Sequence, residues 1–430
     1  MKYYLVGIKG TAMSALALFL QDLGHFVEGS DVSDYYFTED DLKQRSILIH
    51  PFSSSNIDGK SIYIISSAYT ENEEVKKIIE SEYQYYYFHD FIGTLYYKKI
   101  IAVSGTHGKT TTTKMLALFL KNLDVSYIIG SGEGYGSPNS KELVIEACEY
   151  KEHFLSFNPY VAIINNIELD HPDYYKSIKD VIRSFNLFAK SAPYLIINGD
   201  DENCQKIIHP HKITYGFKPG NMVRVKILEE TSKGYKISVE YKEDIYKFDI
   251  PWCGKHMIYN FLAAFSYILK FCFVDIINGI QDKINNFIFP KRRDKEYILN
   301  NTILIDDYAH HPTEISALYN AIKQKYVDYK IYVLFQPHTY SRTIKLKKQF
   351  IKVLSKFDKV YIAKTFTSKR ENYLEKSEKK VNKIFKHFLI FDNTTIETVK
   401  KSINNNEKAV WIFLGAGTIN NYLKQLITKE

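Results

Sequence analysis

The sequence contains few cysteines and tryptophans, and it has no long apolar run. Its four cysteines lie far apart and form no C-x-x-C pair, which excludes a zinc ribbon and a disulfide scaffold. The longest clean apolar stretches, such as residues 15–20, are far shorter than the ~20 residues of a membrane-spanning helix. The first ten residues also lack the apolar core and the cleavage site of a signal peptide. We therefore expect a cytoplasmic protein with reduced thiols and no membrane insertion.

The composition is that of a globular protein with several domains. The 430 residues correspond to about three domains. Hydrophobic residues make up 45% and charged residues 25%, which excludes a disordered chain, a collagen and a coiled coil. The charge is mildly positive, with 57 basic residues against 49 acidic ones, and the basic residues are dispersed. A nucleic-acid partner is therefore not expected.

Short β-rich runs alternate with longer helical patterns along the chain, which predicts an α/β fold of parallel sheets with crossover helices. Three runs start such units: Tyr3–Gly7, Lys99–Val103 and Thr302–Ile305. We place boundaries near residues 98 and 290, which gives domains 1–98, 99–290 and 291–430. Alternation of apolar and polar residues between Val223 and Ile250 predicts a small antiparallel element that turns at 232–234.

The strongest motif follows the apolar run Ile100–Val103, where Ser104–Thr113 reads SGTHGKTTTT before a helical pattern. A strand, a glycine-rich turn, Lys-Thr and a helix come in the order of a phosphate-binding loop. Glycines allow the backbone to close around phosphate oxygens, and the helix N-terminus carries partial positive charge. Lys109 adds a full charge, and the hydroxyl of Thr110 suits Mg²⁺. The alternative is a turn of small residues before a helix, because G-x-x-G-K-T is shorter than the common motif.

The segment 105–111 resembles the shortened ATP loop of the Mur ligases, the ATP-dependent amide-forming enzymes of peptidoglycan precursor synthesis. His107 after Thr106 is typical of the branch that uses UDP-N-acetylmuramate as acceptor. Further motifs follow in the family's order as far as Gly417. The resemblance implies that ATP is bound by Gly105, Thr106, His107, Gly108, Lys109, Thr110, Thr111, Asn260, Arg293 and Asp307.

Two further strand-like runs end in acidic and histidine side chains, Glu146 in one and His171 in NIELDHPDY in the other. Residues at such strand ends can converge on a bound ligand. On the residues alone, Glu146 could equally be a solvated acid and His171 a helix cap. The resemblance implies Mg²⁺ ligands Thr110, Glu146 and His171, and catalytic residues Lys109, His171 and Arg293. Relatives commonly carry Asp where Cys148 stands, so that position supplies no carboxylate.

Two segments around the second boundary are similar to nucleotide-binding stretches of the family. GKHMIYN at 254–260 resembles the family's G-x-H-N-x-x-N helix start, which implies that Asn260 contacts adenine. Met257 stands in place of the first Asn of that motif. Arg293 ends a basic cluster that would reach the ATP phosphates, and Asp294 replaces the aromatic residue that usually follows.

DDYAHHPTE at 306–314 and PHTYSRT at 337–343 also resemble family motifs, and Asp307 would lie near the ribose of ATP. Arg342 suits the carboxylate of an amino acid, because its planar fork matches two oxygens. The alternative is an arginine that closes a loop. The resemblance implies that the amino acid is bound by Tyr308, His338 and Arg342. Thr339 and Thr418 replace the Arg and Asp found in many relatives.

The glycines after the first strand do not form the dinucleotide motif, because Lys9 occupies the position of the middle glycine. Asp31 nevertheless lies near the place of a ribose-binding acid, so an NAD-dependent oxidoreductase is one rival interpretation. The Mur ligases have a related loop that binds the diphosphate of a UDP-sugar. The resemblance implies that this sugar nucleotide is bound by Gly7, Gly10, Met13, Ser14, Ser30, Asp31, Ser66, Ser67 and Ala68.

The resemblance implies a Rossmann-like UDP-binding domain, a central P-loop ATPase-like domain with the small antiparallel element, and a C-terminal Rossmann-like domain. The implied enzyme joins L-alanine to the lactoyl carboxylate of UDP-N-acetylmuramate through an acyl phosphate, with ATP and Mg²⁺. We expect a monomer or a weak homodimer. Two alternatives stay open: a sister ligase that attaches a recycled murein tripeptide to the same sugar nucleotide, and a non-catalytic nucleotide-binding protein.

Overall fold

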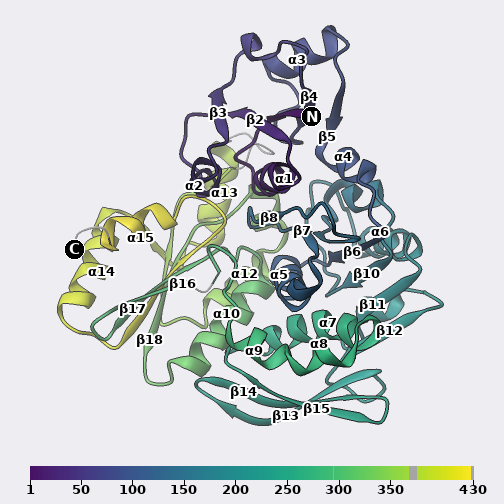
Figure 1. Ribbon diagram of the computed structural model, residues 1–430. Helices are drawn as coiled ribbons and strands as arrows, with labels where there is room; N and C mark the ends of the chain where they lie inside the picture. Colours follow the sequence, from purple (N-terminus) through teal and green to yellow (C-terminus); the bar gives the residue numbers. More distant parts are fainter. Residues whose placement is uncertain (294, 368–374, 428–430) are drawn as a thin grey trace.

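Figure 1 shows the computed structural model, which describes residues 1–293, 295–367 and 375–427. Three sheets follow one another along the chain, each flanked by helices, so the predicted α/β class is confirmed. Asp294, noted above for its departure from the family pattern, lies outside the described residues. Within the described part of the chain, no helix is long and apolar enough to cross a membrane.

The N-terminal sheet is wholly parallel, with strand order β3-β2-β1-β4-β5. Its strands are β1 (Lys2–Val6), β2 (Phe26–Asp31), β3 (Leu48–Pro51), β4 (Ile62–Ile65) and β5 (Tyr85–Tyr87). Its helices are α1 (Thr11–Asp22), α2 (Glu39–Gln44), the 3₁₀ turn η1 (Ser54–Asn56), α3 (Glu73–Glu80) and α4 (Phe88–Thr94). Strand β1 is central and almost wholly buried, as its apolar residues predict.

The central sheet has ten strands in the order β15-β14-β13-β12-β11-β10-β6-β9-β7-β8. Its strands are β6 (Lys99–Ser104), β7 (Ser126–Ile128), β8 (Gly134–Tyr135), β9 (Glu142–Glu146), β10 (Val161–Ile164), β11 (Tyr194–Asn198), β12 (Lys212–Gly216), β13 (Val223–Thr231), β14 (Gly234–Tyr241) and β15 (Asp244–Ile250). The predicted antiparallel element is confirmed as β13 to β15, which turns after Thr231 and extends the parallel part of the sheet.

Helices cover both faces of the central sheet. They are α5 (Lys109–Phe119), η2 (Lys121–Leu123), η3 (Tyr150–Ser156), α6 (Ile178–Lys190), η4 (Cys204–Lys206), α7 (Lys255–Phe271), α8 (Val274–Asn278) and α9 (Ile280–Asn285). Helix α6 begins at a capping box, in which Ser177 and Asp180 each bond the other's backbone N–H. The phosphate-loop segment lies between β6 and α5, which is the order of strand, loop and helix that the motif predicts.

The C-terminal sheet has the order β16-β17-β21-β18-β19-β20 and is parallel except for β16 at its edge. Its strands are β16 (Lys295–Leu299), β17 (Thr302–Asp307), β18 (Lys330–Phe335), β19 (Lys359–Ile362), β20 (Leu389–Ile390) and β21 (Ala409–Leu414). Its helices are α10 (Pro312–Lys325), α11 (Tyr340–Lys345), α12 (Lys347–Leu354), α13 (Glu375–Ile384), α14 (Asn393–Asn404) and α15 (Asn420–Ile427).

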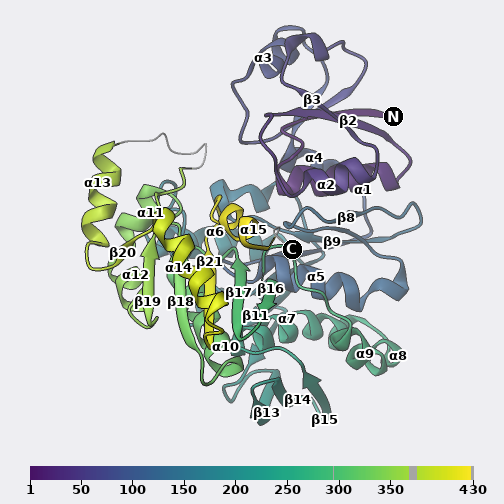
Figure 2. The ribbon, with the colours of Figure 1, turned by 90° about the vertical axis from the view of Figure 1, so that its left-hand side faces the viewer.

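The N-terminal and central domains share one buried apolar cluster, whereas the C-terminal domain has clusters of its own. Helix α1 lies directly against β8, as Figures 1 and 2 both show. Glycine makes this approach possible, since a Cβ at Gly134 would lie 1.9 Å from the carbonyl oxygen of Ala15. The first two domains therefore pack so closely that the backbone of β8 touches that of α1.

Candidate active site

A cavity of about 1640 Å³ lies where the three domains meet. It is lined by these residues predicted from the sequence: Gly10, Asp31, Ser66, Ser67, Ala68, Thr106, His107, Gly108, Lys109, Thr110, Thr111, Glu146, His171, Asn260, Arg293, Asp307, Tyr308, His338 and Arg342. Five other predicted residues do not line it: Gly7, Met13, Ser14, Ser30 and Gly105. Residues that lie hundreds of positions apart in the sequence thus surround one space.

The phosphate loop is compact because its glycines allow close packing. Gly108 has a φ of 78° and precedes the first residue of α5, and a Cβ there would lie 2.3 Å from Oδ1 of Asn260. Asn260 also accepts a hydrogen bond from Oγ1 of Thr112 at 3.4 Å, so it ties α7 to α5. Its amide nitrogen lies 3.9 Å from Sδ of Met257, the residue that replaces the first Asn of the motif.

Lys109 is held over the loop by its own backbone and by Glu149. Its Nζ donates to the carbonyl oxygen of Gly105 at 2.6 Å and lies 2.9 Å from Oε2 of Glu149. The other carboxylate oxygen of Glu149 lies 3.5 Å from Nε2 of His171. Burial alone would raise the pKa of Glu149, but Lys109 and His171 outweigh it and lower that pKa to about 2. Sequence reasoning gave Glu149 no role, because only the fold brings it to Lys109.

Thr110 and Glu146 lie together at the ends of α5 and β9. The hydroxyl of Thr110 donates to Oε2 of Glu146 at 2.8 Å, and the same oxygen accepts from the backbone N–H of Gly130 at 3.0 Å. Hydroxyl and carboxylate oxygens are the ligands that Mg²⁺ prefers, so this pair fits the predicted metal role. His171 lines the same cavity, with a left-handed φ of 53°.

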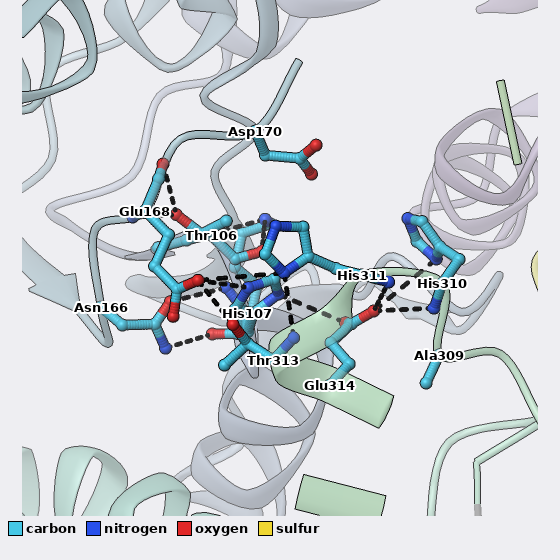
Figure 3. A network of polar contacts seen from close by, with 12 residues as sticks. Thr106, His107, Asn166, Glu168, Asp170, Ala309, His310, His311, Thr313 and Glu314 are labelled. Carbon is cyan, nitrogen blue, oxygen red and sulfur yellow. Dashed lines mark hydrogen bonds and ion pairs between the residues drawn. The ribbon is translucent and has the colours of Figure 1, made fainter. Parts of the chain in front are cut away.

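His107 lies between two carboxylates, as Figure 3 shows. Its Nδ1 is 3.5 Å from Oε1 of Glu314, and its Nε2 is 3.7 Å from Oε2 of Glu168. Burial alone would lower the pKa of His107, but the two acids raise that pKa to about 9. The histidine is therefore protonated at neutral pH and connects the phosphate loop to the start of α10.

Two arginines of the third domain are also paired with acids. Arg293 lies 3.5 Å from Glu314 and 5.5 Å from the ring centroid of Tyr308. Arg342 holds Asp170 through two bonds, Nε to Oδ1 at 2.8 Å and a terminal nitrogen to Oδ2 at 3.1 Å. The fork predicted for an amino-acid carboxylate thus holds a carboxylate of the central domain.

Lys9 stands at the position of the middle glycine of the dinucleotide motif, and its side chain bonds the loop that follows β2. It is buried, and its Nζ donates to the carbonyl oxygens of Val32 and Asp34 and pairs with Glu39 at 2.7 Å. Its backbone N–H donates to Asp31 at 2.8 Å. Lys9 therefore fixes the loop after β2 instead of leaving room above the first turn.

The predicted residues of the first domain separate into two groups. Gly10, Asp31, Ser66, Ser67 and Ala68 reach the cavity. Met13 and Ser14 are buried within α1, and Ser30 is buried on β2 with a hydrogen bond to Glu74. Tyr69, which the sequence did not single out, donates to Asp31 at 2.9 Å and lines the cavity.

Three family models match consecutive parts of the chain. They are the Mur ligase family, catalytic domain, at residues 2–98; the Mur ligase middle domain at 103–268; and the Mur ligase, glutamate ligase domain at 294–417. A UDP-N-acetylmuramate–L-alanine ligase of Streptococcus agalactiae serotype V is 41% identical, over 98% of this chain and 96% of the relative. The chain belongs to the Mur ligase family.

Other Mur ligases extend this comparison. The UDP-N-acetylmuramate–L-alanine ligase of Streptococcus pyogenes serotype M5 is 42% identical, again over 98% of this chain and 96% of the relative. The solved structure of the UDP-N-acetylmuramate-alanine ligase MurC of Thermotoga maritima has a TM-score of 0.81 at 25% identity, covering 99% of this chain and 98% of that one. A murein peptide ligase of Psychrobacter arcticus shares the fold, with a TM-score of 0.74 at 20% identity, covering 100% of this chain and 98% of that one.

Proposed function

We propose that this chain joins L-alanine to the lactoyl carboxylate of UDP-N-acetylmuramate, at the expense of ATP, in peptidoglycan synthesis. It is a UDP-N-acetylmuramate–L-alanine ligase, as are the relatives that match it over nearly its full length. One structural observation supports this most strongly. The phosphate loop, the Thr110–Glu146 pair and the arginines of the third domain all border one cavity.

A carboxylate does not condense with an amine in water without activation. In the proposed reaction, the lactoyl carboxylate attacks the γ-phosphorus of ATP and displaces ADP. The amine of L-alanine then attacks the carbonyl carbon of the acyl phosphate, loses a proton and displaces inorganic phosphate. Gly108, Lys109 and Thr110 would hold the phosphates, and Arg293 would stabilise the charge on the transferring group. Thr110, Glu146 and His171 would hold Mg²⁺, which supplies further neutralisation of phosphate charge when bound.

The positions of the substrates follow the domains proposed above: 1–98 for the sugar nucleotide, 99–290 for ATP and 291–430 for the amino acid. Arg342, His338 and Tyr308 remain our proposal for the amino-acid site, and Asn260 and Asp307 for the nucleoside of ATP. Because Asp170 already holds Arg342, binding of L-alanine through this arginine requires Asp170 to share or release it. We also propose a cytoplasmic monomer or weak homodimer.

The decisive experiment measures phosphate release from ATP with Mg²⁺, UDP-N-acetylmuramate and one of four acceptors. These are L-alanine, glycine, L-serine and the tripeptide L-Ala-γ-D-Glu-meso-diaminopimelate. Release that requires both the sugar nucleotide and L-alanine supports the proposal. Release with the tripeptide alone would assign the protein to the recycling ligases, and no release with any acceptor would favour a non-catalytic binding protein.

A further inference from the structure

The imidazole of His107 has both nitrogens facing carboxylates. Nδ1 faces Glu314 at 3.5 Å and Nε2 faces Glu168 at 3.7 Å, and the ring is largely buried. The charges of the two acids stabilise a protonated ring, although Nε2 of His107 has no hydrogen-bond partner at these distances. Both ring nitrogens therefore face carboxylates of the protein, although the residue lies within the phosphate loop.

The backbone of His107 is fixed as firmly as its side chain. Its N–H donates to Oδ1 of Asn166 at 2.8 Å, and its carbonyl oxygen accepts from the amides of Asn165 at 3.3 Å and Asn166 at 3.1 Å. Both asparagines directly follow β10, the strand beside β6. The direction in which His107 projects is therefore set by the central sheet.

Glu314 divides its two oxygens between helix and cations. Oε2 accepts from the backbone N–H groups of His310 at 3.1 Å and His311 at 3.3 Å, which caps the N-terminus of α10. Oε1 lies 3.5 Å from His107 and 3.5 Å from a terminal nitrogen of Arg293. One carboxylate oxygen thus joins the phosphate loop to the arginine proposed to act on the transferring phosphoryl group.

Glu168 reinforces the same connection from the central domain. It accepts a hydrogen bond from the hydroxyl of Thr313 at 2.6 Å while facing His107 with the same oxygen. The four ionic groups of this set, His107, Arg293, Glu168 and Glu314, balance in charge when His107 is protonated. Figure 3 shows them gathered at the start of α10, apart from Arg293, which the figure does not label.

A metal ion is a poor alternative at this place. His107, Glu168 and His311 have ligand atoms within 4.8 Å of one another. However, Nδ1 of His311 accepts from the backbone N–H of Thr313 at 3.3 Å, which leaves the ring hydrogen on its other nitrogen. A ring in that state offers no free lone pair, so a proton on His107 fits the cluster better than a metal does.

We propose that His107 is a positioning residue: with Glu314 it forms a relay that sets Arg293 against the phosphate loop. In this role His107 does not bind nucleotide phosphates through its ring. The relay rests on the proposed ligase function, because Arg293 has its proposed role only if phosphoryl transfer takes place. The proposal predicts that neutral substitution of His107 or of Glu314 lowers the rate of phosphoryl transfer and leaves the affinity for nucleotide nearly unchanged.

The test compares His107→Gln, Glu314→Gln and the double variant in the full-length protein. We expect each single variant to lower kcat by roughly 10- to 100-fold, because displacement of a reacting group by about 1 Å has effects of that size. The Kd of a non-hydrolysable ATP analogue, measured by calorimetry with Mg²⁺, should stay within about threefold of the wild-type value. The double variant should be no slower than the slower single one, and Glu314→Asp should recover part of the rate.

Glu296→Gln is the matched control, since Glu296 pairs with Lys325 at the other end of α10. It removes one carboxylate charge from the same domain and should leave kcat and Kd unchanged. Two results would overturn the relay. One is a loss of analogue affinity of about tenfold in His107→Gln but not in Glu314→Gln; the other is multiplication of the two single effects in the double variant.

Failure of the ligase function would be visible separately. If the wild-type protein releases no phosphate with L-alanine, the same four proteins are compared by urea denaturation. Non-additive shifts of the midpoint would still support coupling of His107 to Glu314, and additive shifts would refute it. If a variant is too unstable for the turnover assay, the same midpoint shifts in urea denaturation test the coupling of His107 to Glu314.

Discussion

Three cations of the cavity are each paired with an acid from another part of the chain. Lys109 pairs with Glu149 at 2.9 Å, Arg293 with Glu314 at 3.5 Å, and Arg342 with Asp170 at 2.8 Å. Removing one partner of a buried pair leaves an uncompensated charge, so single substitutions mix effects on stability and on chemistry. A single variant of these residues is therefore compared with a variant that removes both charges of the pair.

For Lys109 we predict that Lys109→Ala lowers ATP-dependent turnover by about 100-fold or more, because a fixed positive charge at the phosphates is lost. The double variant Lys109→Met/Glu149→Gln should recover stability, since both charges of the pair are gone, but not activity. Phosphate-release assays and thermal melts of the three proteins give the comparison. Near-normal turnover in either variant would contradict the assignment of the phosphate loop.

His107 supplies a pH-dependent part of the stability. Its pKa rises from 6.5 to about 9 on folding because of Glu168 and Glu314. A raised pKa stabilises the folded state fully below pH 6.5, and this contribution is lost as the pH rises through 9. The excess in the free energy of unfolding of wild type over His107→Gln should be largest just below pH 6.5, shrink between pH 6.5 and about 9, and level off above that. A difference that stays constant or grows with pH would argue against a protonated His107.

Residues of the loop could be predicted from the sequence because their partners are their neighbours. The order of strand, glycines, Lys109 and Thr110 is local, and so is the strand end that carries Glu146. The roles of Glu149, Glu168 and Glu314 could not be predicted, because each depends on a partner supplied by another segment. The bonds of Lys9 could not be predicted either, because its position in the glycine motif does not indicate that its side chain bonds the loop after β2.

At the scale of elements, the contact between α1 and β8 depends on the absence of side chains. A Cβ at Gly134 would lie 1.9 Å from the carbonyl oxygen of Ala15, and one at Gly136 would lie 2.3 Å from that of Phe19. Neither glycine has a positive φ, so their value lies in close approach and not in backbone conformation. The sequence analysis predicted neither the short strand β8 nor its contact with α1.

We predict that Gly134→Ala destabilises the protein by about 1–3 kcal/mol, as overpacking of a tight contact does. Gly279→Ala is the matched control, because a Cβ there meets only the carbonyl oxygen of Ile276 at 3.8 Å. Its effect should be smaller than about 1 kcal/mol and can be stabilising. Urea denaturation of both variants measures the two changes in the free energy of unfolding. Equal changes would mean that α1 and β8 move apart at little cost and contradict the tight contact.

At the scale of the whole molecule, the two domain junctions differ in chemistry. The first two domains share an apolar cluster that includes Leu16 and Phe19 of α1 and Ile145 of β9. The C-terminal domain meets the central one through polar contacts, such as Gln324, which accepts from Tyr235 at 2.7 Å and from the backbone of Gly254 at 2.8 Å. Three domains in the sequence therefore behave as two packing units.

This arrangement predicts unfolding in two stages. Residues 1–290 should lose protection together in hydrogen exchange at rising urea concentration, and residues 295–367 and 375–427 separately. Gly134→Ala should shift the first stage and leave the second unchanged, because its contact lies wholly within the first unit. A single transition that includes all described residues would show that the polar junction is as strong as the apolar one.

The pairs at Lys109, Arg293 and Arg342 also mean that the cavity carries its own counterions. A polyanion that enters displaces carboxylates of the protein itself instead of ions drawn from the solvent. Its affinity should accordingly respond weakly to ionic strength, because bulk salt screens exposed charges far more than buried pairs. A stray phosphate meets the same competition with fewer contacts to offer, so the resident acids favour the complete nucleotide over its fragments.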